Sequence, residues 1–296
     1  MSVIVLGSLN MDIVMETNQL PVIGETLLGD HVDYFIGGKG ANQAVAAART
    51  NIATTLIGQV GTDAFGEKIL TALKRENLHL QVTQTATPTG IAAIFKLPND
   101  NAIVVLPGAN ADFAIDVKAT NAWNDASIFL TQLEISLATV QEGLQLAKAK
   151  GLTTIVNPAP FHSAIVEMLP LIDIITPNET EFAQLIGKEL TSDKELEAAM
   201  LVWSAQHATR LIVTRGSQGT SFVADNTIQT VPALSVAVVD TTGAGDTFNG
   251  LLAAELATGS NFAQAVHLAT IGASLSVQKL GAQSGMPSRE SILQHM

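Results

Sequence analysis

The stretch Asp240-Thr-Thr-Gly-Ala-Gly-Asp-Thr-Phe-Asn-Gly250 follows an apolar run, Val236–Val239, and opens a predicted helix. The small residues Gly243–Gly245 let a ligand approach the backbone closely. N–H groups at a helix N-terminus are unpaired and carry partial positive charge, so this turn predicts an anion hole for a phosphate or a developing negative charge. Asp246 falls in the first turn, where a carboxylate beside an anion hole suits a general base. The alternative is a strand–helix turn whose aspartate only caps the helix.

Outward from this stretch, short apolar runs alternate with helical patterns. The strand candidates are rich in Val, Ile and Thr and are Val3–Leu6, Ala53–Ile57, Ile128–Leu130, Thr153–Val156, Ile172–Thr176 and Leu211–Thr214. The predicted helices span about 41–49, 136–150, with Ser136 as N-cap and Gly151 as stop, and 246–256. This alternation predicts an α/β fold with a mostly parallel sheet. Ligands of such sheets bind at the carboxyl ends of the strands.

Two segments break the alternation. Residues 11–36 contain Pro21, Gly24 and Gly29 among alternating apolar and polar residues, and residues 88–106 hold two apolar runs separated by Pro-Asn-Asp-Asn at 98–101. Both patterns are typical of hairpins. We therefore expect a single domain over residues 1–296, in which these two segments form one small sheet that stands off the core.

Composition and charge exclude several classes of protein. The chain of 296 residues has 15 basic and 27 acidic residues, a formal net charge of −12, and no cysteine. Without cysteine there is no disulfide framework, thiolate metal site or cysteine nucleophile. Few basic residues argue against a nucleic-acid partner. Because no uninterrupted apolar run is long enough for a membrane span and the N-terminus does not resemble a signal peptide, we expect a soluble, cytoplasmic protein.

The glycine-rich stretch Gly37-Gly-Lys-Gly-Ala-Asn-Gln-Ala44 is a second candidate site. Its glycines permit a tight backbone cradle, and Lys39 adds a local positive charge. It is not a Walker A sequence, because Gly40 follows the lysine where Ser or Thr is required. Asn42 can both donate and accept hydrogen bonds, as a sugar hydroxyl requires. The alternative is a plain turn before a helix.

Two further pairs of polar residues follow strand candidates. Asn10 and Asp12 are two apart, so on an extended segment they face the same side and could hold adjacent hydroxyls. Asn178 and Glu181 are three apart after the 172–176 strand, where a phosphate–magnesium network could use them. Turn formation and helix capping are the respective alternatives. The histidines show no metal-ligand spacing, and neither HExxH nor GxSxG is present.

Taken together, the motifs occur in the order and spacing typical of the ribokinase-like (PfkB) carbohydrate kinases, which the sequence resembles over essentially its whole length. The resemblance is carried by the stretches Gly37–Ala47, Asn157–Pro160, Asp173–Glu181 and Asp240–Gly250. It implies a central mostly parallel sheet flanked by helices, with a small β-sheet lid over the sugar and a homodimer formed through the lid. It also implies ATP-dependent phosphorylation of D-ribose at the 5-hydroxyl.

The same resemblance assigns site residues. The sugar would be surrounded by Asn10, Asp12, Gly38, Lys39, Gly40, Asn42, Glu134 and Asp246. Asp246 would be the base, and the transferring phosphoryl group would be stabilised by the amides of Gly243, Ala244, Gly245 and Asp246. The ATP site would be lined by Asn178, Thr214, Arg215, Gly216, Ser217, Gln218, Gly219, Gly245 and Thr270. Glu181 would help to position Mg²⁺.

A monovalent cation, usually K⁺, is also implied by the resemblance. Its ligands, largely backbone carbonyls, would come from Asp240, Thr242, Ser276, Lys279, Gly281 and Gly285. The sequence departs from the family at two positions. Family members commonly carry Asn where this chain has Thr270, and Ser where it has Gly285, with Ser284 one residue earlier. The contact to adenine or ribose at Thr270 and the last cation ligand are therefore open.

Other substrates are the alternatives. Asn10 favours ribose over deoxyribose, because a 2-hydroxyl needs a polar partner and the deoxyribose-preferring relatives carry an apolar residue there. A nucleoside kinase needs an apolar slot for a base, and aromatic residues make up only 4% of this chain. Fructose is a further candidate. A non-catalytic sugar sensor is the alternative from another class, but it would be expected to lose Asp246 first.

Overall fold

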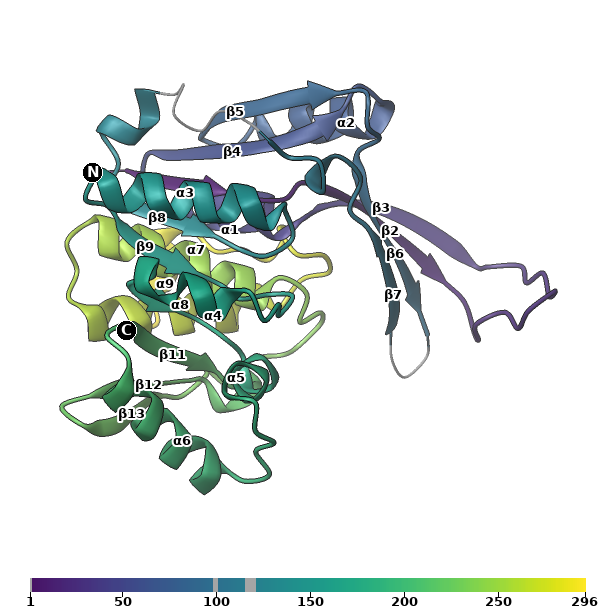
Figure 1. The fold of residues 1–296 in the computed structure, drawn as a ribbon. Coiled ribbons are helices and arrows are strands. Elements are labelled where there is room, and N and C mark those ends of the chain that lie inside the picture. The colour runs from purple at the N-terminus through teal and green to yellow at the C-terminus, as the bar shows by residue number, and fades with distance from the viewer. Residues whose placement is uncertain (1, 98–100, 115–120) are drawn as a thin grey trace.

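The computed structural model describes residues 2–97, 101–114 and 121–296. Within these residues a nine-stranded sheet runs in the order β13-β12-β11-β10-β9-β8-β1-β4-β5 (Figure 1). Pairs from β11 to β5 are parallel, and β12 and β13 join antiparallel. Its strands are β1 Val3–Leu6, β4 Thr54–Gly61, β5 Leu78–Thr85, β8 Ile128–Thr131, β9 Thr153–Val156, β10 Ile174–Ile175, β11 Arg210–Thr214, β12 Thr220–Ala224 and β13 Thr227–Val231.

Helices cover both faces of this sheet (Figure 1). One face packs against α1 Lys39–Ala48, α2 Ala64–Leu73, α7 Ala244–Ala257, α8 Phe262–Ser276 and α9 Arg289–Leu293. The other packs against α3 Leu137–Ala149, α4 Ile165–Met168, α5 Glu179–Ile186 and α6 Asp193–Gln206. Short 3-10 turns are η1 Gly108–Asn110, η3 Asn121–Asn124, η4 Leu169–Leu171 and η5 Gly216–Gln218. Among the described helices, each is too short or too polar to cross a bilayer.

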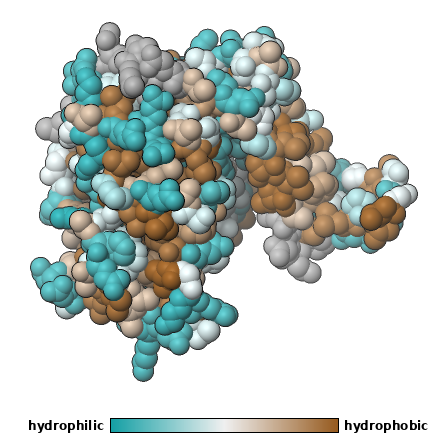
Figure 2. Space-filling view, viewed as in Figure 1, coloured by the Kyte–Doolittle hydropathy of each residue, from teal (hydrophilic) through white to brown (hydrophobic). Residues whose placement is uncertain are grey.

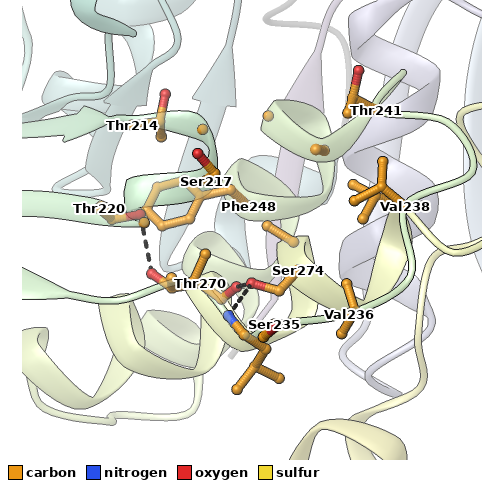
Figure 3. A pocket seen from close by; sticks show the side chains of 18 of the residues that line it. Thr214, Ser217, Thr220, Ser235, Val236, Val238, Thr241, Phe248, Thr270 and Ser274 are labelled. Atoms are coloured by element: carbon orange, nitrogen blue, oxygen red, sulfur yellow. Dashed lines mark hydrogen bonds between the residues drawn. The ribbon is translucent and has the colours of Figure 1, made fainter.

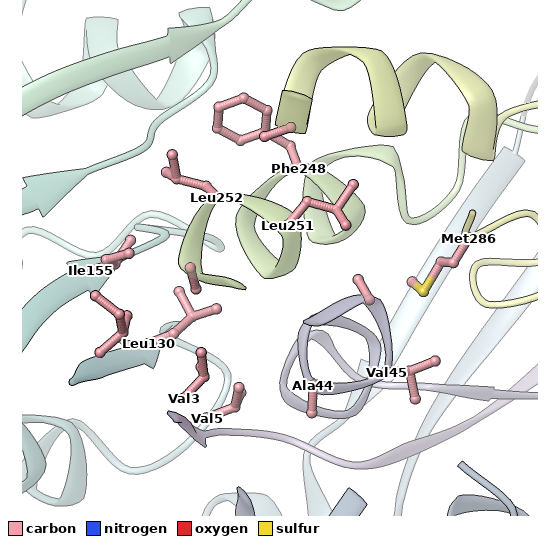
Figure 4. Packing of buried hydrophobic residues seen from close by; sticks show 14 of the residues in the cluster. Val3, Val5, Ala44, Val45, Leu130, Ile155, Phe248, Leu251, Leu252 and Met286 are labelled. Atoms are coloured by element: carbon pink, nitrogen blue, oxygen red, sulfur yellow. The ribbon is translucent and has the colours of Figure 1, made fainter. Parts of the chain in front are cut away.

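Alternation of side chains along β1, an inner strand of the large sheet, explains the two cores. In β1, Val3 and Val5 belong to the cluster under α1 and α7, while Ile4 and Leu6 belong to the cluster under α3. Side chains of successive strand residues point to opposite faces, so a strand buried on both sides reads as one continuous apolar run. Figure 4 shows Val3 and Val5 beside Ala44 of α1 and below Leu252 of α7.

The predicted α/β fold is confirmed, although several element boundaries differ. Thr153–Val156 forms β9 as expected, whereas the 172–176 strand shrinks to Ile174–Ile175. Backbone pairing with β9 nevertheless extends beyond these two residues, because the Asp173 N–H donates to the Thr154 carbonyl and the Thr176 N–H to the Val156 carbonyl. Ser136 does stand at the N-cap of α3, but its side chain makes no capping hydrogen bond.

The two irregular segments form the expected separate sheet. It has four described strands in the order β3-β2-β6-β7, namely β2 Asn10–Glu16, β3 His31–Gly37, β6 Gly90–Lys96 and β7 Asn101–Leu106. β2 pairs parallel with β6, and the outer pairs are antiparallel. The turn predicted at 98–101 falls largely on 98–100, outside the described residues. We call this sheet the lid; it projects from the main body (Figure 1).

The helices α1 and α7 pack unusually close to each other. A Cβ built on Gly250 of α7 would lie 2.4 Å from the Gln43 carbonyl oxygen and 2.7 Å from the Ala46 Cβ, both in α1. Real Cβ atoms do not approach so closely, so a side chain at residue 250 would force the helices apart. Glycine at this position therefore fixes the spacing of the two helices whose N-termini carry the candidate site.

We expect Gly250→Val to destabilise the fold by about 2 kcal/mol, because overpacking a tight contact costs that much. Thermal unfolding followed by circular dichroism measures it as a melting temperature several degrees lower. Gly29→Ala is the matched control, since Gly29 is exposed and its Cβ would meet only the Glu16 carbonyl oxygen, at 3.3 Å. Equal melting temperatures for the two variants would contradict this account of the α1–α7 contact.

Candidate active site

The polar motifs meet at the carboxyl edge of the large sheet. Asn10 follows β1, Glu134 follows β8, Asn178 follows β10, and residues 214–219 follow β11. All these strands are parallel, so their carboxyl ends share one edge. Two cavities lie along it, of about 590 Å³ and about 650 Å³, which we call the lid-side cavity and the helix-side cavity.

The lid-side cavity carries several of the residues predicted to bind sugar. Its lining is Asn10, Lys39, Val105, Pro107, Asn110, Ala111, Leu133, Glu134, Ile135, Ser136, Ala159, Pro160 and Glu181. Asp12, Gly38, Gly40, Asn42 and Asp246, which were also predicted to surround the sugar, are not in this lining. Asp12 nevertheless interacts electrostatically with Glu134 and Lys39, which do line the cavity.

Glycines at the start of α1 bring that helix against the segment after β1. Gly38, the N-cap residue, has φ 86°, and its Cβ would lie 2.8 Å from the Asn10 nitrogen. A Cβ on Gly40 would lie 2.4 Å from the Gly7 carbonyl carbon. The glycine-rich stretch is therefore a close backbone contact, and it places Lys39 beside the cavity.

Asn10 is held in one orientation by a neighbouring asparagine. The Asn110 side-chain amide donates to Asn10 Oδ1 at 2.8 Å, and Asn110 Oδ1 accepts the Leu9 N–H at 3.0 Å. Both asparagines are buried. Because Oδ1 of Asn10 is used in this way, its Nδ2 is the atom left to bind a ligand.

Acidic groups surround Lys39 at the lid-side cavity. Glu134 Oε2 accepts hydrogen bonds from the Ser8 hydroxyl and from the Lys39 backbone N–H. Burial, together with the charges of Glu134 and Asp246, raises the pKa of Asp12 to about 7, and Lys39 partly opposes the shift. The charge of Asp246, followed by that of Glu134, raises the pKa of Lys39 despite its burial. Lys39 therefore stays protonated.

The turn before α7 has the geometry of an anion hole. Gly243 has φ 78°, and its Cβ would lie 2.7 Å from the Ala282 Cβ, so only glycine fits. In the first turn, the N–H groups of Ala244 and Thr247 bond the carbonyls of Thr241 and Gly243. Within the described chain, this leaves the N–H groups of Gly245 and Asp246 for a ligand. A Cβ on Gly245 would meet nothing within 4 Å, so the space above it is open.

Two amides hold the carboxylate of Asp246. Asn42 Nδ2 donates to Oδ2 at 2.9 Å, and Gln43 Nε2 donates to Oδ1 at 3.0 Å. Asp246 is 7% exposed. Asp246 lines neither cavity itself. Its neighbour Gly245 lines the helix-side cavity, and Lys39, with which Asp246 interacts electrostatically, lines the lid-side cavity, which places the carboxylate near both. A base held there can take a proton from one ligand as a second ligand is attacked.

The helix-side cavity contains most of the residues predicted to bind ATP (Figure 3). Those that line it are Asn178, Thr214, Gly216, Ser217, Gly219, Gly245 and Thr270. Arg215 and Gln218 do not line it. The buried Arg215 guanidinium turns away to donate to Glu179 at 3.1 Å and to Asp193 at 2.6 Å. Gln218 instead lines a separate acidic depression with Glu179 and Asp193.

Thr270 is already engaged within the protein. Its hydroxyl is 2.8 Å from the Val266 carbonyl and 3.1 Å from the Thr220 hydroxyl, as Figure 3 shows for the second contact. Ser274, one turn later, accepts the Leu234 N–H at 3.0 Å. This hydrogen bond secures the segment 232–243, whose apolar residues form one wall of the cavity.

Asn178 and Glu181 form a capping box at the start of α5. Asn178 Oδ1 accepts the Glu181 N–H at 2.8 Å, and Glu181 Oε2 accepts the Asn178 N–H at 2.9 Å. Helix capping, the alternative role for this pair, is therefore present in the structure. Asn178 nevertheless lines the helix-side cavity and Glu181 the lid-side cavity. Burial raises the pKa of Glu181, and Lys39 partly offsets this shift.

The residues predicted to hold a monovalent cation gather around Asp240. Its carboxylate accepts from the Thr242 N–H and hydroxyl and from the Gly281 N–H. Burial opposes ionisation, but these hydrogen bonds outweigh it and lower the pKa of Asp240. A Cβ on Gly285 would lie 1.8 Å from the Ser276 carbonyl oxygen, so only glycine fits beside that carbonyl. An ionised carboxylate near backbone carbonyls is an oxygen donor set that fits a hard cation.

Sequence reasoning missed several residues of the site. Gln43 lies in the glycine-rich stretch 37–44, but its contact with Asp246 joins positions that are 203 residues apart. Asn110 closely follows the Pro-Gly pair at 107–108, a turn signal that could have drawn attention to it. The apolar wall of the helix-side cavity, Ala233, Leu234, Val236, Val238, Phe248, Ala273 and Val277, has no polar motif to single it out.

Known proteins with similar sequences and structures are carbohydrate kinases. A sequence profile described as pfkB family carbohydrate kinase matches residues 1–289. Ribokinase of Lactococcus lactis is 39% identical over 293 residues, 97% of this chain and 94% of that protein. Ribokinase of Bacillus subtilis is 38% identical over 295 residues, 98% of each chain. The structure of Arabidopsis thaliana ribokinase complexed with ribose and ATP has a TM-score of 0.91 and 30% identity, covering 99% of this chain and 97% of that chain.

The raised pKa of Asp12 predicts a pH-dependent stability. Between pH 4 and 7 the folded chain keeps a proton on Asp12 that the unfolded chain releases, so stability falls as the pH rises through this window. The loss is at most about 4 kcal/mol. Asp12→Asn removes the titrating carboxyl group and with it this loss of stability. The melting temperature of the variant should therefore fall less than that of the wild type between pH 5 and pH 8. Parallel pH profiles for Asp12→Asn, wild type and the exposed control Asp30→Asn would refute the prediction.

Proposed function

Since this chain belongs to the pfkB family of carbohydrate kinases, we propose that it transfers the γ-phosphoryl group of ATP to the 5-hydroxyl of D-ribose, yielding D-ribose 5-phosphate and ADP. The observation that carries the proposal is the position of Asp246. Its carboxylate is fixed by two amides at the N-terminus of α7, near both a cavity with sugar-binding groups and a cavity suited to a nucleotide.

The chemistry follows from that position. The sugar lies in the lid-side cavity, where Asn10, Lys39 and Glu134 supply polar partners for its hydroxyls. Asp246 takes the proton of the 5-hydroxyl as this oxygen attacks the γ-phosphorus and the bond to the bridging oxygen of ADP breaks. The N–H groups of Gly245 and Asp246 bind the charge on the transferring group, which is the electrostatic part of catalysis.

ATP occupies the helix-side cavity in this proposal. The adenine packs against the apolar wall that includes Val236 and Val238, and the phosphates reach the N-terminus of α7. Glu181 would help to position Mg²⁺, which would neutralise phosphate charge when ATP is bound. Arg215 and Gln218 face away from this cavity, so we assign them to holding the 214–219 loop.

We propose that K⁺ binds beside Asp240 with carbonyl ligands from Ser276, Lys279, Gly281 and Gly285. Bound there, the cation supplies positive charge behind the anion hole. Thr242 stays a candidate ligand. The hydroxyl of Ser284 lies within hydrogen-bonding distance of the Leu280 and Gly281 carbonyls, and we assign the last ligand to Gly285.

Ribose is favoured over deoxyribose by Asn10, because its buried Nδ2, which has no partner among the described residues, would be left unpaired when the acceptor lacks the 2-hydroxyl. Fructose and nucleosides are the other acceptors, and a non-catalytic sugar sensor is the alternative from another class. ADP release, coupled to an indicator enzyme and measured across these sugars and common nucleosides, distinguishes them. The highest kcat/KM is expected for ribose; no ADP with any acceptor would favour the sensor.

We propose that two copies of the chain associate through their lids in the cytoplasm. The lid exposes Val32, Tyr34, Ile103, Val104, Val105 and Leu106. Figure 2 shows apolar residues gathered over the lid strands and at its tip. Contiguous exposed apolar surface of this kind usually marks an interface. Analytical ultracentrifugation tests it. The absence of cysteine is compatible with the reducing cytoplasm.

Asp246→Asn is expected to lower kcat with ribose by about 10²- to 10⁴-fold, because an amide cannot accept the proton. Nucleotide binding, measured by calorimetry with ADP, should stay within a few-fold of wild type. Near wild-type turnover of a pure Asp246→Asn sample would remove Asp246 as the base.

The cation site predicts that turnover rises several-fold when Na⁺ is replaced by K⁺ at constant ionic strength. Asp240→Asn should abolish this difference, because the charge facing the cation is lost. Melting temperatures in the two salts, without substrate, give a second readout that should show the same pattern. Equal wild-type activity and melting temperature in both salts would mean that no selective site exists.

A further inference from the structure

Behind Asp246 lies a chain of buried polar side chains, of which the proposed reaction so far uses only the Gln43 amide that holds the base. It consists of Gln132, Gln43, Asn157, Thr176 and Asn249, each 7% exposed or less. They come from α1, from α7 and from the segments that follow β8, β9 and β10. Buried amides and hydroxyls destabilise a fold unless they are hydrogen-bonded. Apolar residues would fill this space at a lower cost in folding free energy. The presence of these five polar residues therefore indicates a function.

Gln43 is the centre of this chain. Its Nε2 donates both to Asp246 Oδ1 at 3.0 Å and to Asn157 Oδ1 at 3.1 Å, while its Oε1 accepts from Gln132 Nε2 at 2.7 Å. An ionised carboxylate can only accept, so the atom of Gln43 that faces Asp246 must be the NH₂ group. Every partner of the Gln43 amide is thereby accounted for, and the side chain has one orientation.

The chain continues from Asn157 to the anion hole. Asn157 Nδ2 donates to the Thr176 carbonyl at 3.2 Å, and the Thr176 hydroxyl donates to Asn249 Oδ1 at 2.5 Å. Asn249 Nδ2 then donates to the Gly245 carbonyl at 2.8 Å. This carbonyl belongs to the same peptide group as the N–H of Asp246, so the last bond fixes the direction of that N–H.

We propose that Gln43 is a positioning residue that locks the carboxylate of Asp246 to the anion-hole peptide, so that proton removal and charge stabilisation act on one fixed geometry. The inference rests on the proposed function of Asp246. Asn42 on Oδ2 and Gln43 on Oδ1 together block rotation of the carboxylate. The chain through Thr176 and Asn249 fixes the peptide relative to it. Such preorganisation lowers the barrier, since no group must reorient during the reaction.

Charged groups around Asp246 bear on the test. Lys39 from α1, Asp12 from β2 and Glu181 from α5 interact with it electrostatically. Among the described residues, none of the three is hydrogen-bonded to Gln43. A change at Gln43 therefore acts on Asp246 directly. Asp12, whose pKa is about 7, and Glu181 are present in wild type and variants alike, so the test compares the pH profiles of variant and wild type.

Two variants of Gln43 test the proposal in the full chain. Gln43→Leu removes the donors at similar volume and should lower kcat with ribose and ATP roughly 10- to 100-fold, with KM for both substrates within a few-fold. Gln43→Glu places a second carboxylate against Oδ1, so the pair retains a proton. The acid limb of its kcat–pH profile should move up by about one unit or more.

Thr139→Val is the matched control. Thr139 is equally buried, and its hydroxyl donates to the Phe113 carbonyl in the other core, away from Asp246. The control should lower the melting temperature as Gln43→Leu does but leave kcat and the pH profile unchanged. Thr176→Val, which breaks the chain one step further on, should lower kcat by less than Gln43→Leu.

The outcomes separate this inference from the proposed function. If Gln43→Leu and Gln43→Glu are folded and keep the wild-type kcat and acid limb while Asp246→Asn is inactive, the positioning role is wrong and the base assignment stands. If Asp246→Asn itself turns over ribose at near wild-type rate, the base assignment and the positioning role are both overturned. A lower kcat for Gln43→Leu with the shifted acid limb for Gln43→Glu supports the proposal.

Discussion

The close contact of α1 with α7 is the constraint on which the rest of the site depends. Gly250 lets the backbone of α7 approach the Gln43 carbonyl, and Gly40 lets α1 approach the segment after β1. The N-termini of both helices therefore meet at the carboxyl edge of the sheet. One brings Lys39, Asn42 and Gln43, and the other brings the anion hole and Asp246. A larger spacing would separate the base from the amides that hold it.

The same geometry reconciles an acidic chain with phosphate binding. The net charge of −12 opposes ATP, which is also negative. Positive potential is needed only where the phosphates lie, and the unpaired N–H groups of Gly245 and Asp246 supply it at short range. Lys39 adds a full charge, because the surrounding carboxylates raise its pKa. Those carboxylates are thus part of how a single lysine remains charged despite its burial.

The sequence predicted what depends on local pattern. Val3–Leu6 and Thr153–Val156 are buried parallel strands, and a continuous apolar run between turn residues is enough to indicate them. The lid could also be predicted from local pattern, because its two segments do not alternate between strands and helices. The family motifs then placed Asn10, Lys39 and Asp246 near one edge of one sheet.

Contacts between distant segments could not be predicted in this way. Arg215 belongs to a motif, yet its guanidinium turns to Glu179 and Asp193, because a buried charge must be paired. The run Val236–Val239 suggests a buried strand, but it lies outside any strand and partly lines a cavity. Its apolar character serves a ligand rather than the core, which a hydrophobic pattern alone cannot distinguish.

The capping box at α5 shows why a structural explanation of a motif does not exclude a functional one. Asn178 and Glu181 satisfy each other's backbone N–H groups, as many helix starts do. The reciprocal bonds also fix both side chains, one at the wall of the helix-side cavity and one at the wall of the lid-side cavity. A cap with free rotamers would leave these two side chains mobile at the cavity walls. The capping bonds of this short helix therefore fix one side chain at the wall of each cavity.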